Sequence, residues 1–312
     1  MSAQSPRDSL VELVTPTGTL HGSLLVPAHA TPVPVVLIIA GSGPTDRNGN
    51  SAALQGKNNS LLLLAEALGD AGIASLRYDK RGIAASAASM RSEADVRFDN
   101  YIADAEGWVA LLRADHRFST VTIAGHSEGS LIGMVAAKRA GVDGYVSIAG
   151  AGRAAADILR EQLKPQLPPA MFEASDSVLR ELEAGRVQTA LPAAVSGVPG
   201  LASLFRVSVQ PYLISWFKDK PAVEIARLTI PALIIQGSTD IQVGEVDARA
   251  LAAAKPDAKL EIIEGMNHIF KLVPADRATQ VASYTDPALP IAPKLPALIA
   301  AFVTALPTGA SH

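Results

Sequence analysis

The sequence predicts an α/β protein in which a mostly parallel sheet carries helices on both faces. Short β-branched runs alternate with stretches of helical periodicity from residue 10 onward. The run at residues 33–40 is apolar throughout, which is typical of a strand buried on both faces. This alternation stops after Gly152 and resumes with a helix near residues 211–217, which indicates an insertion over the carboxyl edge of the sheet.

The individual elements follow from local patterns. Residues 10–14 and 19–26 are predicted strands joined by a turn at Pro16-Thr17-Gly18. Helical spacing over residues 58–72 ends at Gly72, a favourable C-cap. The other predicted strands are 73–78, 121–124, 144–149, 232–236 and 259–263, and the other predicted helices are 98–114, 130–138, 211–217, 246–254 and 296–306.

These elements divide the chain into a core and a cap. Residues 1–150 and 216–312 are predicted to form the α/β core. Residues 151–215 begin with a polar helical stretch and continue with a segment rich in Ala, Pro, Gly and Val. We predict that they form a helical cap on the core rather than an independent domain.

Composition excludes several classes of function. A net charge of −3 offers no basic field for nucleic acid. The absence of cysteine excludes disulfides, thiolate metal sites and a cysteine nucleophile. The polar first residues lack the apolar segment of a signal peptide, and the longest apolar run is too short to span a bilayer. We therefore expect a cytoplasmic protein that binds neither nucleic acid nor membranes, with a trimmed export signal as the alternative.

The pentapeptide G-H-S-E-G at residues 125–129 is the strongest functional signal. A β-branched run precedes it and a helical stretch follows it, which is the context of a nucleophile elbow. Glycines suit so tight a turn, and the serine oxygen then projects above the sheet. The pattern predicts Ser127 as a catalytic nucleophile.

A serine nucleophile needs a base to take its proton, and His268 is the best candidate. It follows the predicted strand at 259–263, in a loop at the carboxyl end of the sheet, where catalytic groups gather in open α/β sheets. The alternative is a loop histidine without a role. The other histidines occupy less suitable positions. They are His21 in a strand, His29 in a turn, His116 in a loop, His126 in the elbow and His312 at the terminus.

The base in turn needs an acid that fixes its tautomer, and we predict Asp240 for this role. Asp240 follows the predicted strand at 232–236, so it shares the sheet edge with Ser127 and His268. The alternative for Asp240 is that it caps the next helix. Weaker candidates for the acid are Asp247, Glu261 and Glu264.

The remaining requirement is a pair of donors for an oxyanion. The backbone N–H of Glu128, directly after the nucleophile, is one predicted donor. The loop after the strand at 33–40 should supply the other, and we assign it to the N–H of Ser42, with Gly41 or Gly43 as alternatives. This loop matches neither phosphate-binding glycine motif, so no nucleotide site is expected.

Several motifs together resemble the α/β-hydrolase superfamily. These are the elbow, the loop G-S-G-P-T-D-R-N-G at 41–49, the sequence Y-D-K-R-G at 78–82 and the sequence Q-G-S-T-D at 236–240. More narrowly, they are similar to bacterial serine carboxylesterases whose oxyanion loop reads G-S-G-P-x-D-R-[ND]-G. The resemblance implies an eight-stranded sheet, the triad Ser127, Asp240 and His268, and hydrolysis of esters with short acyl chains without a cofactor.

Other residues allow two interpretations. Asp79, Lys80 and Arg81 could face a substrate, but we favour a role in tying neighbouring loops together. Trp216 and Phe217 are candidate substrate-binding residues that could line an acyl pocket, or could belong to the core.

The sequence therefore predicts a serine carboxylesterase for short- to medium-chain esters. Its expected partner is a small ester, and a homodimer is left open. Alternatives on the same triad are a peptidase, thioesterase, lactonase or acyltransferase, and the alternative from another class is a non-catalytic binding module. A peptidase acting on free amino ends would need acidic groups in the cap, and the candidates Glu173, Asp176, Glu181 and Glu183 have the spacing of a solvated helix face.

Overall fold

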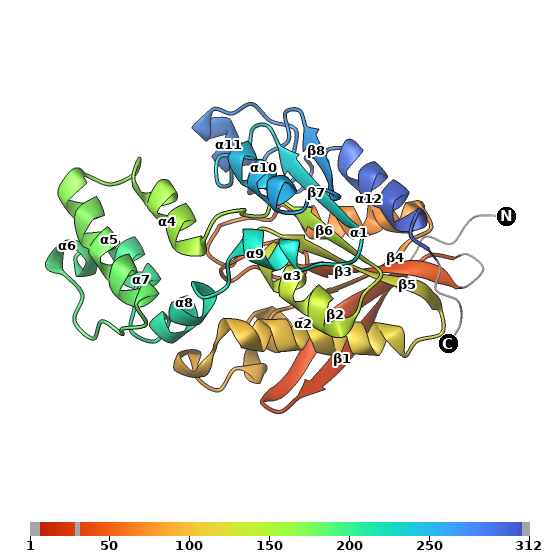
Figure 1. The fold of residues 1–312 in the computed structure, drawn as a ribbon, viewed down its shortest axis with the longest axis horizontal. Helices are drawn as coiled ribbons and strands as arrows, with labels where there is room; N and C mark the ends of the chain where they lie inside the picture. Colours follow the sequence, from red (N-terminus) through yellow and green to blue (C-terminus); the bar gives the residue numbers. More distant parts are fainter. Residues whose placement is uncertain (1–6, 29–31, 308–312) are drawn as a thin grey trace.

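Eight strands form one sheet in the computed structural model, which describes residues 7–28 and 32–307 (Figure 1). The strand order is β1-β2-β4-β3-β5-β6-β7-β8. The first two strands run antiparallel to their neighbours, and the other six are parallel, so the prediction of a mostly parallel eight-stranded sheet is confirmed. The strands are β1 (Arg7–Thr15), β2 (Gly18–Val26), β3 (Val33–Ile39), β4 (Ala74–Tyr78), β5 (Phe118–His126), β6 (Gly144–Ile148), β7 (Ala232–Gly237) and β8 (Lys259–Ile263).

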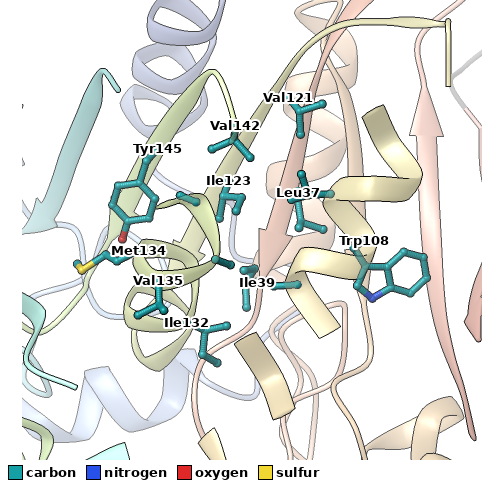
Figure 2. Packing of buried hydrophobic residues seen from close by; sticks show 14 of the residues in the cluster. Leu37, Ile39, Trp108, Val121, Ile123, Ile132, Met134, Val135, Val142 and Tyr145 are labelled. Atoms are coloured by element: carbon teal, nitrogen blue, oxygen red, sulfur yellow. The ribbon is translucent and has the colours of Figure 1, made fainter. Parts of the chain in front are cut away.

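Helices cover both faces of the sheet because the central strands are apolar on both sides. Along β3, Val35 and Leu37 contribute to one core cluster, while Val36 and Ile38 contribute to the other. The first cluster packs against α2 (Phe98–Arg113), α3 (Glu128–Ala140), α9 (Pro221–Ala226) and α10 (Glu245–Ala254). Figure 2 shows the part of this cluster between Trp108 of α2, Ile132 of α3 and the central strands. The second cluster packs against α1 (Ser60–Asp70) and α12 (Lys294–Thr304).

Five helices between β6 and α9 lie to one side of the sheet and share a core of their own (Figure 1). They are α4 (Ala155–Leu163), α5 (Pro169–Glu183), α6 (Ala193–Ser196), α7 (Pro199–Leu204) and α8 (Gln210–Trp216). Leu179, Phe205 and Leu213 are among the side chains of this cluster. The helices fall almost entirely within the segment predicted as a cap, and α8 crosses its predicted end by one residue.

Four short helices outside the cap were not predicted. They are the 3-10 helices η1 (Ala84–Ser89) and η2 (Glu93–Asp95), and the α-helices α9 and α11 (Arg277–Ser283). Each spans at most seven residues, which is too short for a helical period to be distinct in a sequence. No helix within residues 7–28 and 32–307 combines the length and apolar character needed to cross a bilayer.

Candidate active site

Ser127 occupies a sharp turn between β5 and α3. Its backbone has φ 55° and ψ −120°, a conformation that is costly for a residue with a side chain. The flanking glycines permit the turn: a Cβ on Gly125 would lie 2.2 Å from the Gly129 carbonyl oxygen. A Cβ on Gly129 would lie 2.4 Å from the Ile39 oxygen of the neighbouring strand. The elbow predicted at residues 125–129 therefore has the required backbone geometry.

Asp240 and His268 form a buried pair at the carboxyl ends of β7 and β8. Asp240 Oδ2 lies 2.8 Å from His268 Nδ1, and their side chains are 0% and 5% exposed. Asp240 also accepts hydrogen bonds from the backbone N–H groups of Gln242 and Val243 and from the amide of Gln236. Its carboxylate thus holds the β7–α10 loop and the histidine together, and it does not cap α10, which begins at Glu245.

Electrostatics keep Asp240 ionised. Burial alone would raise the pKa of its carboxyl, but the attraction of His268 and the donated hydrogen bonds outweigh burial and hold that pKa below its usual value. An ionised carboxylate opposite Nδ1 leaves Nε2 of His268 as the nitrogen that can accept a proton.

His126, inside the elbow, contacts His268. His126 Nε2 donates to the backbone carbonyl of His268 over 2.9 Å, and the two ring centroids lie 4.8 Å apart. Phe270 packs edge-on against the His126 ring, with ring centroids 4.8 Å apart. Burial and the neighbouring His268 lower the pKa of His126 to about 3, so His126 is neutral at pH 7. Sequence reasoning set this residue aside, because nothing in the sequence shows that the His268 loop packs on the elbow.

The loop after β3 lies against the nucleophile. A Cβ on Gly41 would lie 3.1 Å from Ser127 Cβ, which is closer than most side-chain contacts, so a glycine suits this close approach. Ser42 lines the same cavity as Ser127 and Glu128. Among the described residues, the N–H groups of Ser42 and Glu128 have no hydrogen-bond acceptor.

A buried cluster of charged and phenolic groups joins three segments beside the elbow. Lys80 Nζ donates to the Gly41 carbonyl over 2.6 Å and to Glu128 Oε2 over 2.7 Å. The hydroxyl of Tyr212, on α8, donates to the other oxygen of Glu128. Burial and the Glu128 carboxylate raise the pKa of Tyr212 well above its ordinary value, so its hydroxyl keeps its proton. The expectation that Lys80 ties loops together is therefore correct, and the link from Tyr212 is new.

Comparisons with known proteins complement this geometry. Residues 58–192 match a family model described as serine aminopeptidase, S33. The esterase EstD of Thermotoga maritima is 28% identical over 257 residues, which is 80% of this chain and 58% of EstD. The chain therefore matches less than two thirds of the length of this relative.

Solved structures resemble nearly the whole chain. An esterase from Pyrococcus furiosus superposes with a TM-score of 0.60 at 14% identity, over 98% of this chain and 93% of that one. The α/β hydrolase GrgF from Penicillium sp. gives 0.56 at 20% identity, over 84% and 91%. Est1E from Butyrivibrio proteoclasticus gives 0.58 at 17% identity, over 88% and 94%.

The chain has the α/β-hydrolase fold.

In this α/β-hydrolase fold, a cavity of about 640 Å³ lies between the elbow and the cap. Ser127 is part of its wall, together with Ser42, Lys80 and Glu128. Apolar side chains form most of the remaining wall, among them Met90, Val96, Leu131, Ile158, Leu159, Leu204, Val209, Leu213 and Trp216. Such a volume and lining are typical of a site for a small organic ligand.

The two predicted substrate-binding aromatics have different surroundings. Trp216 lines the cavity and stacks on Phe98, with ring centroids 6.1 Å apart. Phe217 is 8% exposed and belongs to the core cluster of the cap, and it does not line the cavity. The structure therefore places Trp216 on the cavity wall and Phe217 in the core of the cap, and substrate binding by Trp216 stays a prediction.

Two of the three weaker acid candidates have other partners, and the third, Glu264, is exposed. Asp247 is buried and accepts from the backbone and guanidinium of Arg153, and so holds the first turn of the cap. Glu261 pairs with Lys259 and Lys294. The acidic side chains of α5 also form ion pairs: Glu173 and Asp176 with Arg180, Glu181 with Arg186 and Glu183 with Arg160. Of the histidines set aside, His29 and His312 lie outside the described residues.

Proposed function

We propose that this protein is a serine carboxylesterase acting on esters with short to medium acyl chains. The observation that carries the proposal is the buried Asp240–His268 pair, packed against an elbow whose Ser127 opens into an apolar cavity. The similarity to the esterase EstD supports hydrolysis of esters in particular.

In the proposed reaction, His268 Nε2 takes the hydroxyl proton of Ser127 as its oxygen attacks the acyl carbon. Asp240 stabilises the imidazolium that forms. The tetrahedral intermediate collapses when His268 returns the proton to the leaving alcohol, which leaves an acyl group on Ser127. Water then attacks that acyl group with His268 as base, and the acid and free serine are released.

The negative charge of the tetrahedral intermediate needs donors that are already in place. The N–H groups of Ser42 and Glu128 are suitable because both residues line the cavity and neither N–H has another acceptor among the described residues. Glu128 also begins α3, so its N–H lies at the positive end of the helix dipole.

The family match to serine aminopeptidases suggests a second reaction on the same residues. Recognition of a free amino terminus would require an unpaired carboxylate in the cavity. The acidic residues on the cavity wall, Glu93 and Glu128, are ion-paired with Arg206 and Lys80. This pairing favours a neutral ester over an aminoacyl substrate.

The test of the proposed function combines labelling with turnover. A fluorophosphonate probe should label the wild-type protein at Ser127, and Ser127→Ala should abolish both labelling and hydrolysis of p-nitrophenyl butyrate. Ser203→Ala, at another serine of the cavity wall, is the control and should retain both. A panel of p-nitrophenyl esters, thioesters, lactones and aminoacyl anilides then defines the reaction class. Absence of labelling would indicate a binding module, and anilides as the best substrates would favour the peptidase.

A further inference from the structure

Lys80 is a buried cation on the wall of the cavity that Ser127 also lines. Its side chain is 2% exposed, and it follows β4 directly. The Nζ atom lies 5.2 Å from the centre of the Tyr101 ring in addition to its bonds to Gly41 and Glu128. A lysine held in this way by three segments has little freedom of movement.

The bond from Lys80 to the Gly41 carbonyl fixes the direction of a neighbouring donor. The Gly41 carbonyl and the Ser42 N–H belong to one peptide group, and in a trans peptide these two bonds point in opposite directions. Holding the carbonyl oxygen toward Nζ therefore turns the N–H of Ser42 away from Lys80. A charge-assisted bond to the carbonyl is strong and also polarises the peptide, which makes its N–H a better donor.

The bond from Lys80 to Glu128 affects the second donor. Glu128 is buried at the start of α3, and its carboxylate is held by Lys80 on one oxygen and by Tyr212 on the other. Without Lys80 that carboxylate would be an unpaired negative charge close to the oxyanion, which it would repel. Lys80 thus aligns one donor and neutralises the charge beside the other.

We propose that Lys80 is a positioning residue for the oxyanion hole, which it prepares by orienting the Gly41–Ser42 peptide and by pairing with Glu128. This proposal rests on the proposed esterase function and on the two donors assigned above. In this role Lys80, the lysine of the sequence Y-D-K-R-G, stabilises the transition state and does not contribute to substrate binding.

The direct test is Lys80→Met, which keeps the apolar stem and removes the donor. We expect kcat for p-nitrophenyl butyrate to fall about 100-fold, as on loss of one oxyanion donor, with KM changed by less than about threefold. Inhibition by a trifluoromethyl ketone, which forms a tetrahedral adduct on serine, should weaken in parallel with kcat. Binding of a non-reactive methyl ether analogue of the substrate should stay unchanged.

Lys255→Met is the matched control. Lys255 is also buried and also binds a backbone carbonyl and a carboxylate, those of Leu228 and Asp257, but it does not line the cavity. It should also lower the thermal midpoint, though less, because Asp257 is exposed and stays hydrated without its partner, while kcat stays within threefold of the wild type. If Lys80→Met lowers only the thermal midpoint, or weakens ketone and ether binding equally, the role of Lys80 is structural and the proposal is wrong.

The double variant Lys80→Met/Glu128→Gln covers the case in which the single variant fails to fold. It leaves no unpaired charge, so it should fold and regain part of the lost kcat, but it still lacks the donor to Gly41. Wild-type kcat in this variant would overturn the proposal. If a fluorophosphonate does not label the wild-type protein, the proposed esterase function is wrong. If it labels the wild-type protein and Lys80→Met keeps the wild-type kcat, only the proposed role of Lys80 is wrong.

Discussion

The Nε2 atom of His126 donates a hydrogen bond to the backbone carbonyl of His268 over 2.9 Å. The residue before the nucleophile therefore holds the loop that carries the proposed base. Because a carbonyl oxygen can only accept, the bond also fixes His126 as the tautomer protonated at Nε2. The elbow and the His268 loop consequently form one unit, although 142 residues separate their histidines in the sequence.

Because His126 is buried in this contact, we expect the free energy of unfolding to depend on pH. The pKa of His126 is about 3 in the folded protein and 6.5 in its ordinary state, so the unfolded chain binds an additional proton between these pH values. Stability should therefore fall as the pH drops below 6.5, by about 2–3 kcal/mol at pH 4.5 from this residue. His126→Phe removes the titration and should flatten that part of the curve, as measured by urea unfolding from pH 4.5 to 7.5. The same substitution at the exposed His116 is the control, and an unchanged slope in His126→Phe would contradict the prediction.

Asp240 and Asp247 are two buried aspartates with different expected roles. Asp240→Asn should lower kcat about 10³- to 10⁴-fold, because the amide cannot hold His268 in the tautomer that accepts a proton at Nε2. Asp247→Asn should instead lower the thermal midpoint by several degrees, because it weakens the bonds to Arg153 and to the N–H of Gly152. Steady-state kinetics and thermal unfolding of both variants separate these roles. Comparable loss of kcat in the two variants would refute the assignment.

The sequence predicts the framework of the site because each of its parts has a local signal. Ser127 lies in a spaced glycine motif, and Asp240 and His268 each follow a strand with a distinct apolar pattern. The supporting contacts have no such signal. Lys80 reaches Gly41 and Glu128 across 39 and 48 residues, and Tyr212 reaches Glu128 across 84, so these contacts exist only once the sheet order and the cap are known.

Glycine at position 129 should be essential for the elbow. In Gly129→Ala the new Cβ would meet the carbonyl oxygens of Ile39 and Ala40 at 2.4 and 2.7 Å, and backbone atoms in a central strand have little room to move. We expect a loss of stability of about 3 kcal/mol or more, together with loss of fluorophosphonate labelling at Ser127. Gly200→Ala on α7 is the control, since its Cβ would meet no atom within 4 Å, and it should be neutral or slightly stabilising. If Gly129→Ala is labelled as well as the wild type, the backbone at the end of β3 can shift to accept the Cβ, and the prediction is wrong.

Trp216 and Phe217 are adjacent, but only Trp216 lines the cavity. Trp216→Ala should enlarge the acyl site and raise the ratio of kcat/KM for p-nitrophenyl octanoate over acetate about tenfold. Phe217→Ala should instead leave a void in the cap core and lower the free energy of unfolding by about 3 kcal/mol, with little change in that ratio. Ester-series kinetics and urea unfolding of the two variants distinguish these effects. If Phe217→Ala alters the ratio while Trp216→Ala does not, the acyl chain binds within the cap core rather than in the cavity above Ser127.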